Sequence, residues 1–417
     1  MRMDQAHGDV TADAQPVAPR TTSVKRAKTR RVRRVGIWLA RVVLALCFLA
    51  GLFFSLFPSG RALVRAVTIL PGLLAADQPA WQAPIAEPVT HTVTAISSPA
   101  GPVYLDVYAP SAGAPPLPGA REGILIIPGV GDQRKDVQLI NFSETLAHAG
   151  LVVMDMTTSA LIDNRLDVED KEAAIQAFHT LQHWPNVGSE RVGVLGFSAG
   201  GPLMCFAAAD PRMRNEVAFV ALFGGYFDTT TLLQDIGRRA LNENGSLQAW
   251  HPVAYPLEVL ANTIASSLPG NDGQMLASAF GPAGHGSLPA EQVAQLAPSS
   301  AAVYHLLAGD EPALVNANLA ALSPAVKILL SSLSPSGIVR EVRAPIYLLH
   351  DRSDPFVPVT ESREFATYLG KLRHPYDYAE FGIFQHVEIR ADLGFSQLLG
   401  DGQNLLRLLS KVTQLGS

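Results

Sequence analysis

Two periodicities begin near residue 89 and predict two kinds of β-strand. Apolar and polar residues alternate over 90–97 and 103–108, which predicts two half-buried strands joined by a turn. Continuous apolar runs predict strands that are buried on both faces of a parallel sheet. These runs, together with a last, mixed strand, fall at residues 123–128, 151–156, 191–197, 217–223, 344–350 and 376–381.

Helical spacing fills most of the intervals between these strands. Apolar residues recur every three or four positions at 137–149, 169–183, 359–369 and 395–412, and a small-residue helical pattern follows residue 198. Strands that alternate with helices form βαβ units, which build a parallel sheet with helices on both faces. We therefore expect one α/β domain over residues 89–417.

The strand pattern stops between residues 229 and 342. Six helical stretches, separated by Gly-, Pro- and Ser-rich segments, occupy this interval, and the abundance of small residues over 269–286 predicts a loop. Because buried strands resume at residue 344, we interpret 229–342 as a helical insertion in the same domain.

The N-terminal region predicts a membrane segment. Residues 1–34 are rich in Lys and Arg, which indicates a basic disordered tail. Residues 35–57 are apolar apart from Arg41, and as a helix they would span roughly 34 Å, enough to cross a bilayer. Basic residues crowd the N-terminal flank, so we expect a single-pass membrane protein with a cytoplasmic N-terminus and an extracytoplasmic folded domain.

Other interpretations of this region stay open. A cleaved signal peptide is an alternative for residues 35–57, and Arg33-Arg34 is a weak indication of twin-arginine export. Proline and glycine recur over 58–88, which predicts a linker. Within it, 62–76 is apolar enough to lie on a membrane surface.

Charge and cysteine content narrow the classes of function. The chain has 417 residues and a formal net charge of −5, and its basic residues gather in the tail, which argues against nucleic-acid binding. Cys47 lies in the apolar run and Cys205 in the folded region, so we expect no disulfide framework.

The run Gly196-Phe197-Ser198-Ala199-Gly200 has the G-x-S-x-G pattern between a predicted strand and a predicted helix. A serine on such a tight turn carries its hydroxyl above the sheet edge. Side chains two positions before and after it would collide with neighbouring backbone, so glycine is favoured there. Ser198 is therefore our candidate nucleophile.

A serine nucleophile needs a base, and the base needs an orienting acid. Asp354 follows the strand 344–350 in a loop at the sheet edge that also carries Ser198, and we prefer it as the acid. Asp351 and Asp228 also follow strand ends and are alternatives. Among the histidines, only His374 and His386 come after the acid. We prefer His386, which follows the last strand and completes the order Ser, Asp, His.

An acyl-transfer reaction also needs donors for the oxyanion. We expect these to be the backbone N–H groups of Ala199, directly after the nucleophile, and of Val130, in the loop after the strand 123–128. The adjacent residues 132–134 are candidates for substrate contact, although solvated turn residues would look the same.

With these residues the chain resembles the α/β-hydrolase superfamily over about residues 89–412. The run 191–201 is similar to the dienelactone-hydrolase-like and acyl-thioesterase-like branches. The resemblance implies eight mostly parallel strands, with the insertion 229–342 between the sixth and seventh acting as a lid. Two departures concern the site. Pro128-Gly129 stands where many members have His-Gly, and Ser198 stands where dienelactone hydrolases use cysteine.

Our leading hypothesis is a membrane-anchored serine hydrolase that cleaves an ester or thioester through an acyl-enzyme. We expect a small-molecule or lipid-like acyl substrate, membrane contact through the N-terminal helix, and no cofactor, metal or nucleic acid. A peptidase or an acyltransferase on the same triad is the alternative. A non-catalytic binding protein with this fold is a further one.

Overall fold

The computed structural model describes residues 42–44, 46, 57–74, 87–111, 121–243, 245–390 and 395–414. The chain divides into two compact units, Met1–Gly60 and Arg61–Ser417, and the account below concerns the second. The expected basic tail, 1–34, and almost all of the expected transmembrane helix, 35–57, lie outside the described residues. Within the described ranges, no single helix has both the length and the apolar character to cross a membrane, although one bent pair of helices, Pro312–Ala321 with Pro324–Ser332, meets the same criteria.

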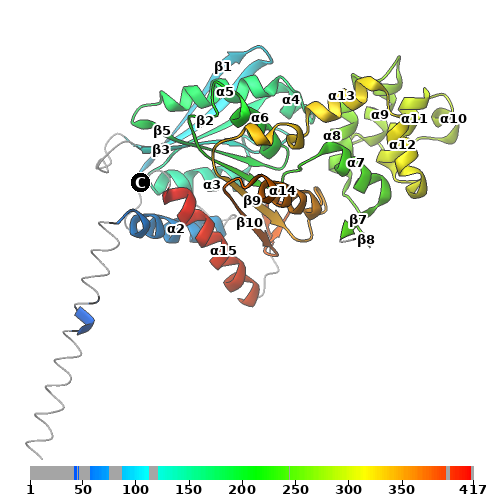
Figure 1. Cartoon of the computed structure of the whole chain (residues 1–417). Helices are drawn as coiled ribbons and strands as arrows, with labels where there is room; N and C mark the ends of the chain where they lie inside the picture. The colour runs from blue at the N-terminus through cyan, green and yellow to red at the C-terminus, as the bar shows by residue number, and fades with distance from the viewer. Residues whose placement is uncertain are drawn as a thin grey trace, which may run out of the picture. The chain divides into compact units, whose positions relative to one another are not determined.

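The core of the second unit is an eight-stranded sheet in the order β1-β2-β4-β3-β5-β6-β9-β10 (Figure 1). β2 is antiparallel to both of its neighbours, and all other pairs are parallel. This mostly parallel arrangement confirms the expected α/β class and fits an α/β-hydrolase. The strands are β1 Val89–Ser98, β2 Gly101–Pro110, β3 Arg121–Ile127, β4 Val152–Thr158, β5 Val187–Phe197, β6 Val217–Phe223, β9 Ile346–Asp351 and β10 Tyr376–Phe381.

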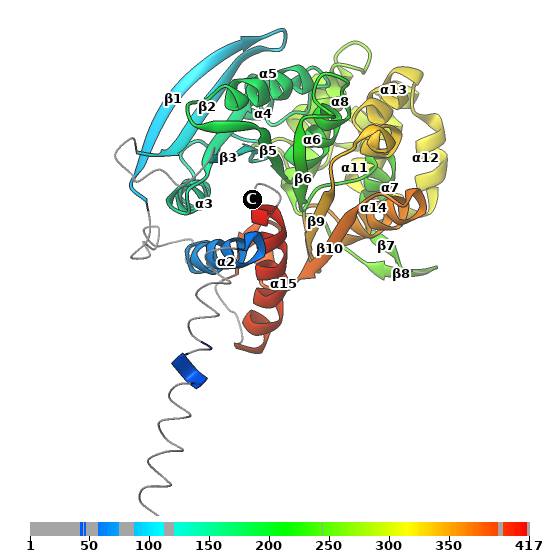
Figure 2. The ribbon, with the colours of Figure 1, turned by 60° about the vertical axis from the view of Figure 1, so that its left-hand side comes forward.

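Helices cover both faces of the sheet and divide the core into two clusters. One face, which we call the closed face, packs against α5 Asp170–Gln182, α6 Gly200–Ala209 and α14 Val359–Leu372. The other, which we call the open face, is covered by α2 Pro58–Leu74, α3 Val137–His148 and α15 Phe395–Gln414. In Figures 1 and 2, α2 and α15 lie side by side.

The range 58–88, expected to be a linker, is not one throughout. Its first part is α2, whose Ala62, Ala66 and Ile69 repeat at helical spacing and are buried. Arg65 does not break the helix because its guanidinium donates to Glu122 Oε1 at 2.7 Å. Gly72 allows close packing on α3, since a Cβ there would come within 2.6 Å of the Thr145 side chain.

The insertion between β6 and β9 is largely helical, as expected (Figure 1). The expectation of a loop over 269–286 was wrong in part, because Asp272–Phe280 forms α9. Its small residues allow tight packing: a Cβ at Gly273 would come within 2.1 Å of the carbonyl oxygen of Ala265. A short hairpin that the apolar pattern does not predict, β7 Ala240–Glu243 with β8 Ser246–Ala249, is also present. The other elements are α7 Thr229–Arg238, α8 Ala254–Ala265, α10 Ala290–Val293, α11 Pro298–Ala308, α12 Val315–Ala321 and α13 Pro324–Ser332.

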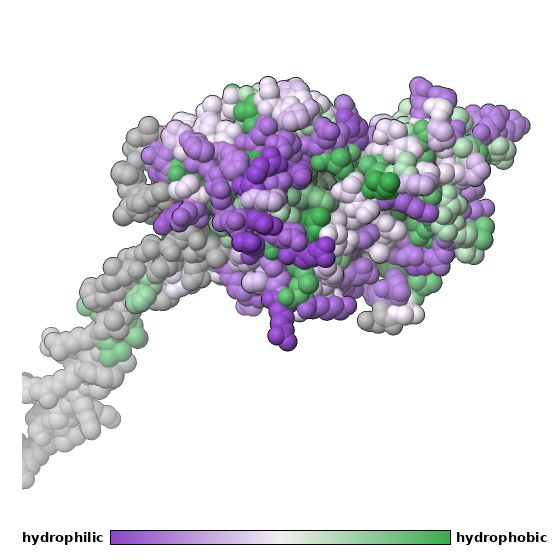
Figure 3. Space-filling model, turned by 45° about the horizontal axis from the view of Figure 1, so that its top comes forward, coloured by the Kyte–Doolittle hydropathy of each residue, from purple (hydrophilic) through white to green (hydrophobic). Residues whose placement is uncertain are grey.

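One side of the molecular surface is visible in Figure 3. It is largely hydrophilic, with hydrophobic residues exposed in small groups. Exposed large apolar side chains of the sheet domain and insertion include Val93, Leu247 and Ile328, which lie far apart in sequence. Single exposed apolar residues of this kind are normal on a folded protein.

Candidate active site

Ser198 stands on a strained turn between β5 and α6. Its φ is +50°, in the left-handed region that residues other than glycine rarely adopt. Both predicted glycines are required by close contacts. A Cβ at Gly196 would come within 2.2 Å of the carbonyl carbon of Gly200, and one at Gly200 within 2.3 Å of the carbonyl oxygen of Ile127. The Ser198 N–H donates to Phe223 O at 2.8 Å, which fixes the turn to β6.

Asp354 and His386 form a buried hydrogen-bonded pair. His386 Nδ1 lies 2.6 Å from Asp354 Oδ2, so donation from Nδ1 leaves Nε2 as the basic nitrogen. Asp354 Oδ1 accepts from the backbone N–H groups of Phe356 and Val357. Burial alone would raise the pKa of Asp354, but the charge of His386 and hydrogen bonds from His350 and His386 outweigh it and hold the pKa well below its usual range.

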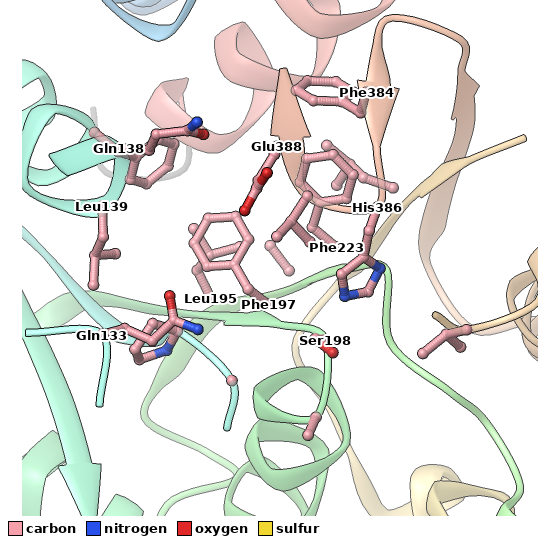
Figure 4. A pocket seen from close by; sticks show the side chains of 18 of the residues that line it. Gln133, Gln138, Leu139, Leu195, Phe197, Ser198, Phe223, Phe384, His386 and Glu388 are labelled. Atoms are coloured by element: carbon pink, nitrogen blue, oxygen red, sulfur yellow. The ribbon is translucent and has the colours of Figure 1, made fainter. Parts of the chain in front are cut away.

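The His386 ring faces Ser198. Figure 4 shows the imidazole above the Ser198 hydroxyl, at the edge of the same pocket. Phe356 stacks on the ring, with centroids 4.6 Å apart. A Cβ at Gly224 would come within 3.0 Å of the imidazole, so glycine leaves room for it. The three residues predicted from sequence are thus brought to one place.

The alternative acids and base have other partners. Asp351 Oδ2 accepts from the backbone N–H of His386 at 3.2 Å, so it holds the backbone of the base. Asp228 caps α7 by accepting from the Thr230 N–H. His374 Nε2 lies 2.8 Å from the carbonyl oxygen of Ala344, away from the pair. The geometry therefore favours Asp354 and His386.

Two contacts of the acid were not predicted. His350 is fully buried, and its Nε2 lies 3.4 Å from Asp354 Oδ2. From the insertion, Trp250 donates its indole N–H to the Asp354 carbonyl oxygen at 2.8 Å. The position of His350 at the end of a buried strand was the available sequence indication, since a polar residue there needs buried partners.

The loop that follows β3 passes close to Ser198, since a Cβ at Gly129 would come within 3.4 Å of the Ser198 Cβ. Val130 and Ala199 both line the cavity that contains Ser198. In the same loop, the Gly131 N–H donates to Leu161 O at 2.7 Å and is engaged there. Gln133 donates to the Val130 carbonyl oxygen at 3.1 Å, which braces the loop. The N–H of Val130 is therefore the better placed donor of this loop.

The cavity has a volume of about 490 Å³, and we divide it into two lobes by the elements that line it. One, which we call the sheet lobe, lies between the open face and α15, and the other, the insertion lobe, is formed mainly by α8 and the loops near it. The sheet lobe is lined by Leu195, Phe219, Ala221, Tyr347, Leu409 and Val412 among others. The insertion lobe includes Tyr226, Leu232, Tyr255, Val259, Leu260 and Phe356.

Metal-ligating side chains do not gather in the described part of the chain. No group of three or more His, Cys, Asp or Glu residues is arranged there to hold a metal ion.

No model of a protein family matches the chain, and no curated protein does. Similar solved structures include a puromycin-hydrolyzing peptidase of Mycobacterium tuberculosis, with 18% identity and a TM-score of 0.46 over 80% of this chain and 40% of that one. Dipeptidyl peptidase 4 of Porphyromonas gingivalis has 11% identity and a TM-score of 0.44, over 78% of this chain and 36% of that one. The 2,6-dihydroxy-pseudo-oxynicotine hydrolase has 13% identity and a TM-score of 0.43, over 78% of this chain and 68% of that one. The chain thus spans about 40% or less of the length of the two peptidases.

Proposed function

We propose that the chain is a serine hydrolase that transfers an acyl group to Ser198 and then to water. The observation that carries this proposal is the buried Asp354–His386 pair, at 2.6 Å, facing a serine held at a φ of +50°. A protein that only binds its ligand does not need a serine in a strained turn or a buried His–Asp pair, and it could replace either without losing its function. Their meeting at one cavity supports catalysis over the binding-protein alternative.

The mechanism follows from the geometry. Ser198 Oγ attacks the substrate carbonyl carbon while His386 Nε2 takes the hydroxyl proton, and Asp354 stabilises the imidazolium. The N–H groups of Val130 and Ala199 bind the oxyanion, and the leaving group departs with the proton from His386. Water then attacks the acyl-enzyme with the same base, which releases the acid and restores Ser198.

The bond that is cleaved is a finer question. The sequence favours an ester or thioester, with a peptidase or an acyltransferase as the alternative. Two of the solved structures named above are peptidases by name, at TM-scores below 0.5, so we keep an amide beside the ester or thioester as a bond to test. Both bonds are opened by the same steps, because only the leaving group differs.

Labelling with a fluorophosphonate that carries a short alkyl group tests the proposal, since such a probe phosphorylates an activated serine. We expect the full chain to be labelled and Ser198→Ala to be unlabelled, with hydrolysis reduced on the order of 10⁴-fold to 10⁶-fold. Ser246→Ala, at an exposed serine of β8, is the matched control and should label fully. A folded wild-type chain that takes no label would rule out the proposed function. Paired p-nitrophenyl ester and p-nitroanilide substrates then separate esterase from amidase activity.

The insertion and the N-terminus enter the proposal in different ways. Tyr255 and Val259 of α8 line the cavity, and Trp250 contacts the acid loop, which supports a covering role for the insertion. Its action as a movable lid stays a prediction. The membrane anchor, residues 35–57, and the extracytoplasmic location also stay predictions.

A further inference from the structure

The sheet lobe lies where a closely packed core would be expected. β5 is an interior strand of the sheet, yet Leu195 and Phe197, which point to the open face, are only half-buried. Val192 and Val194 of the same strand point to the closed face and are fully buried. Interior strands normally lose their solvent contact on both faces, so the exposure of Leu195 and Phe197 marks a hollow and not an edge.

This hollow is continuous with Ser198. Figure 4 shows Phe197, Phe223 and Phe384 side by side above Ser198 and His386. The rings of Phe197 and Phe223 have centroids 6.0 Å apart, and those of Phe223 and Phe384 are 4.7 Å apart. These rings make an apolar wall that begins beside the nucleophile and continues under α15.

We propose that the sheet lobe binds a linear acyl chain of about ten to twelve carbons, whose carbonyl group lies at Ser198. This inference rests on the proposed function and names its substrate class. The lobe presents mostly hydrocarbon, and each buried methylene would favour binding by ~0.8 kcal/mol, or about fourfold. The chain would stay in the lobe as the ester of Ser198 while the leaving group departs.

The insertion lobe suits the leaving group better. Its Tyr255 hydroxyl donates to Asn164 Oδ1 at 2.8 Å, and Asn164 in turn donates to Glu258 at 3.0 Å. Tyr255 is the polar side chain that lines this lobe, whereas the sheet lobe is lined mainly by aromatic and aliphatic side chains, with Gln138 and the exposed Glu388 as its polar neighbours (Figure 4). The two lobes thus match the two halves of an acyl compound.

The length of the lobe sets the length of the chain. Along β6 it reaches from Phe223, beside Ser198, back to Phe219, which is four residues or ~13 Å. Three backbone bonds span at most ~3.6 Å, so an extended chain advances ~1.2 Å per bond. A length of ~13 Å therefore holds about ten bonds.

Helix α15 runs along the length of the lobe, from the sheet edge that carries Ser198 to the opposite edge. Near its start, Asp401 accepts from the Gly382 N–H, just after the end of β10 and at the edge that carries Ser198. Farther along, Arg407 pairs with Asp377, near the start of β10. Val412 borders the starts of β3 and β6, where it contacts a small cavity with Gly123. The residues that face the lobe are Leu405, Leu408, Leu409 and Val412, at spacings of three, four and seven.

Tryptophan substitutions along α15 test the proposal. Using the full chain and p-nitrophenyl esters from acetate to hexadecanoate, we expect wild-type kcat/KM to rise with chain length up to about ten or twelve carbons. Val412→Trp, at the far end, should lower the ratio of kcat/KM for dodecanoate to that for butanoate about 16-fold if two methylenes are displaced. Leu409→Trp lies nearer Ser198 and should lower the ratio further.

Leu406→Trp is the matched control, because Leu406 is on the same helix, is half-buried and does not line the lobe. It should leave the ratio unchanged. The proposal is wrong if wild type prefers acetate, or if Leu406→Trp and Leu409→Trp change the ratio equally. Labelling of Ser198 by the short fluorophosphonate is read in the same samples. If labelling persists while the chain-length profile fails, only this inference falls; if labelling is absent, the proposed function falls.

Discussion

The two faces of one sheet pack in different ways. On the closed face, α6 begins with Gly200 and Gly201, so the start of the helix lies directly on the sheet: a Cβ at Gly200 would come within 2.3 Å of the Ile127 carbonyl oxygen. On the open face, the aromatic rings of Phe142, Phe197 and Phe223 stand between the strands and the helices. Small residues bring a helix down onto a sheet, whereas large rings hold it away and leave room. The difference places a rigid core behind Ser198 and a cavity beside it.

Truncation of a leucine on each face should show the difference in packing between the two faces most clearly. Leu181→Ala removes a fully buried side chain from the closed face and should cost about 2–5 kcal/mol of unfolding free energy. Leu409→Ala, on the half-buried stripe of α15, should cost about 1 kcal/mol, because its side chain already borders a cavity. Urea unfolding with an unchanged m-value measures both. Equal costs would mean that the open face is packed as tightly as the closed one.

Enlargement of an alanine gives the converse test. Ala207→Leu inserts atoms into the packed interface between α6 and the sheet and should cost about 1–3 kcal/mol. Ala221→Leu points into the sheet lobe, which has room, so the cost should stay below about 0.5 kcal/mol. Thermal unfolding followed by circular dichroism compares the two variants with wild type. A larger loss of stability for Ala221→Leu than for Ala207→Leu would contradict the presence of a hollow on the open face.

Each face also holds a buried carboxyl group, and between these two groups the expected difference is the smallest, because burial raises both pKa values to about 8. Burial raises the pKa of Glu361 on the closed face, and of Asp155 on the open face, to about 8. Between the unfolded value near 4.5 for Glu361 and about 8, the folded state binds more protons, so stability falls as pH rises. The slope is at most ~1.4 kcal/mol per pH unit for each group.

The substitution Glu361→Gln sharpens this comparison. The amide oxygen can still accept from the N–H groups of Phe227 and Asp228, which Glu361 Oε2 binds at 2.8 Å. The amide does not titrate. As the pH rises from 6 to 7, the free energy of unfolding of the variant should therefore fall by about 1 kcal/mol less than that of wild type. Asp155→Asn, which keeps an acceptor for Ser143, is the counterpart on the open face. Parallel pH profiles for wild type and both variants would show that neither group carries the effect.

Much of the fold was predictable because local patterns and packing agreed. All eight strands of the sheet were expected within a few residues, since buried parallel strands are continuous apolar runs. The elements that were missed depend on tertiary contacts. α9 is built from small residues that indicate a loop, and it is held by its close approach to α8. α2 carries Arg65 and Pro71, and its charge is neutralised by Glu122, far away in the sequence.

The candidate site was predictable to a similar degree. The order Ser198, Asp354, His386 follows from strand ends, because the carboxyl ends of parallel strands meet at one edge. The choice between Asp351 and Asp354 rests on three residues of loop geometry, which the sequence does not specify. The sheet lobe could not be predicted at all, since hollow and filled interiors have the same apolar pattern.

The hydrogen bond between Trp250 and the acid loop has an optical consequence. Indole emission depends on the polarity around the ring, and Trp250 is buried with its N–H on the Asp354 carbonyl oxygen. Any motion that separates the insertion from this loop exposes the indole to water and shifts its emission to the red. The protein thus contains its own fluorescent reporter, attached to the residue that orients His386.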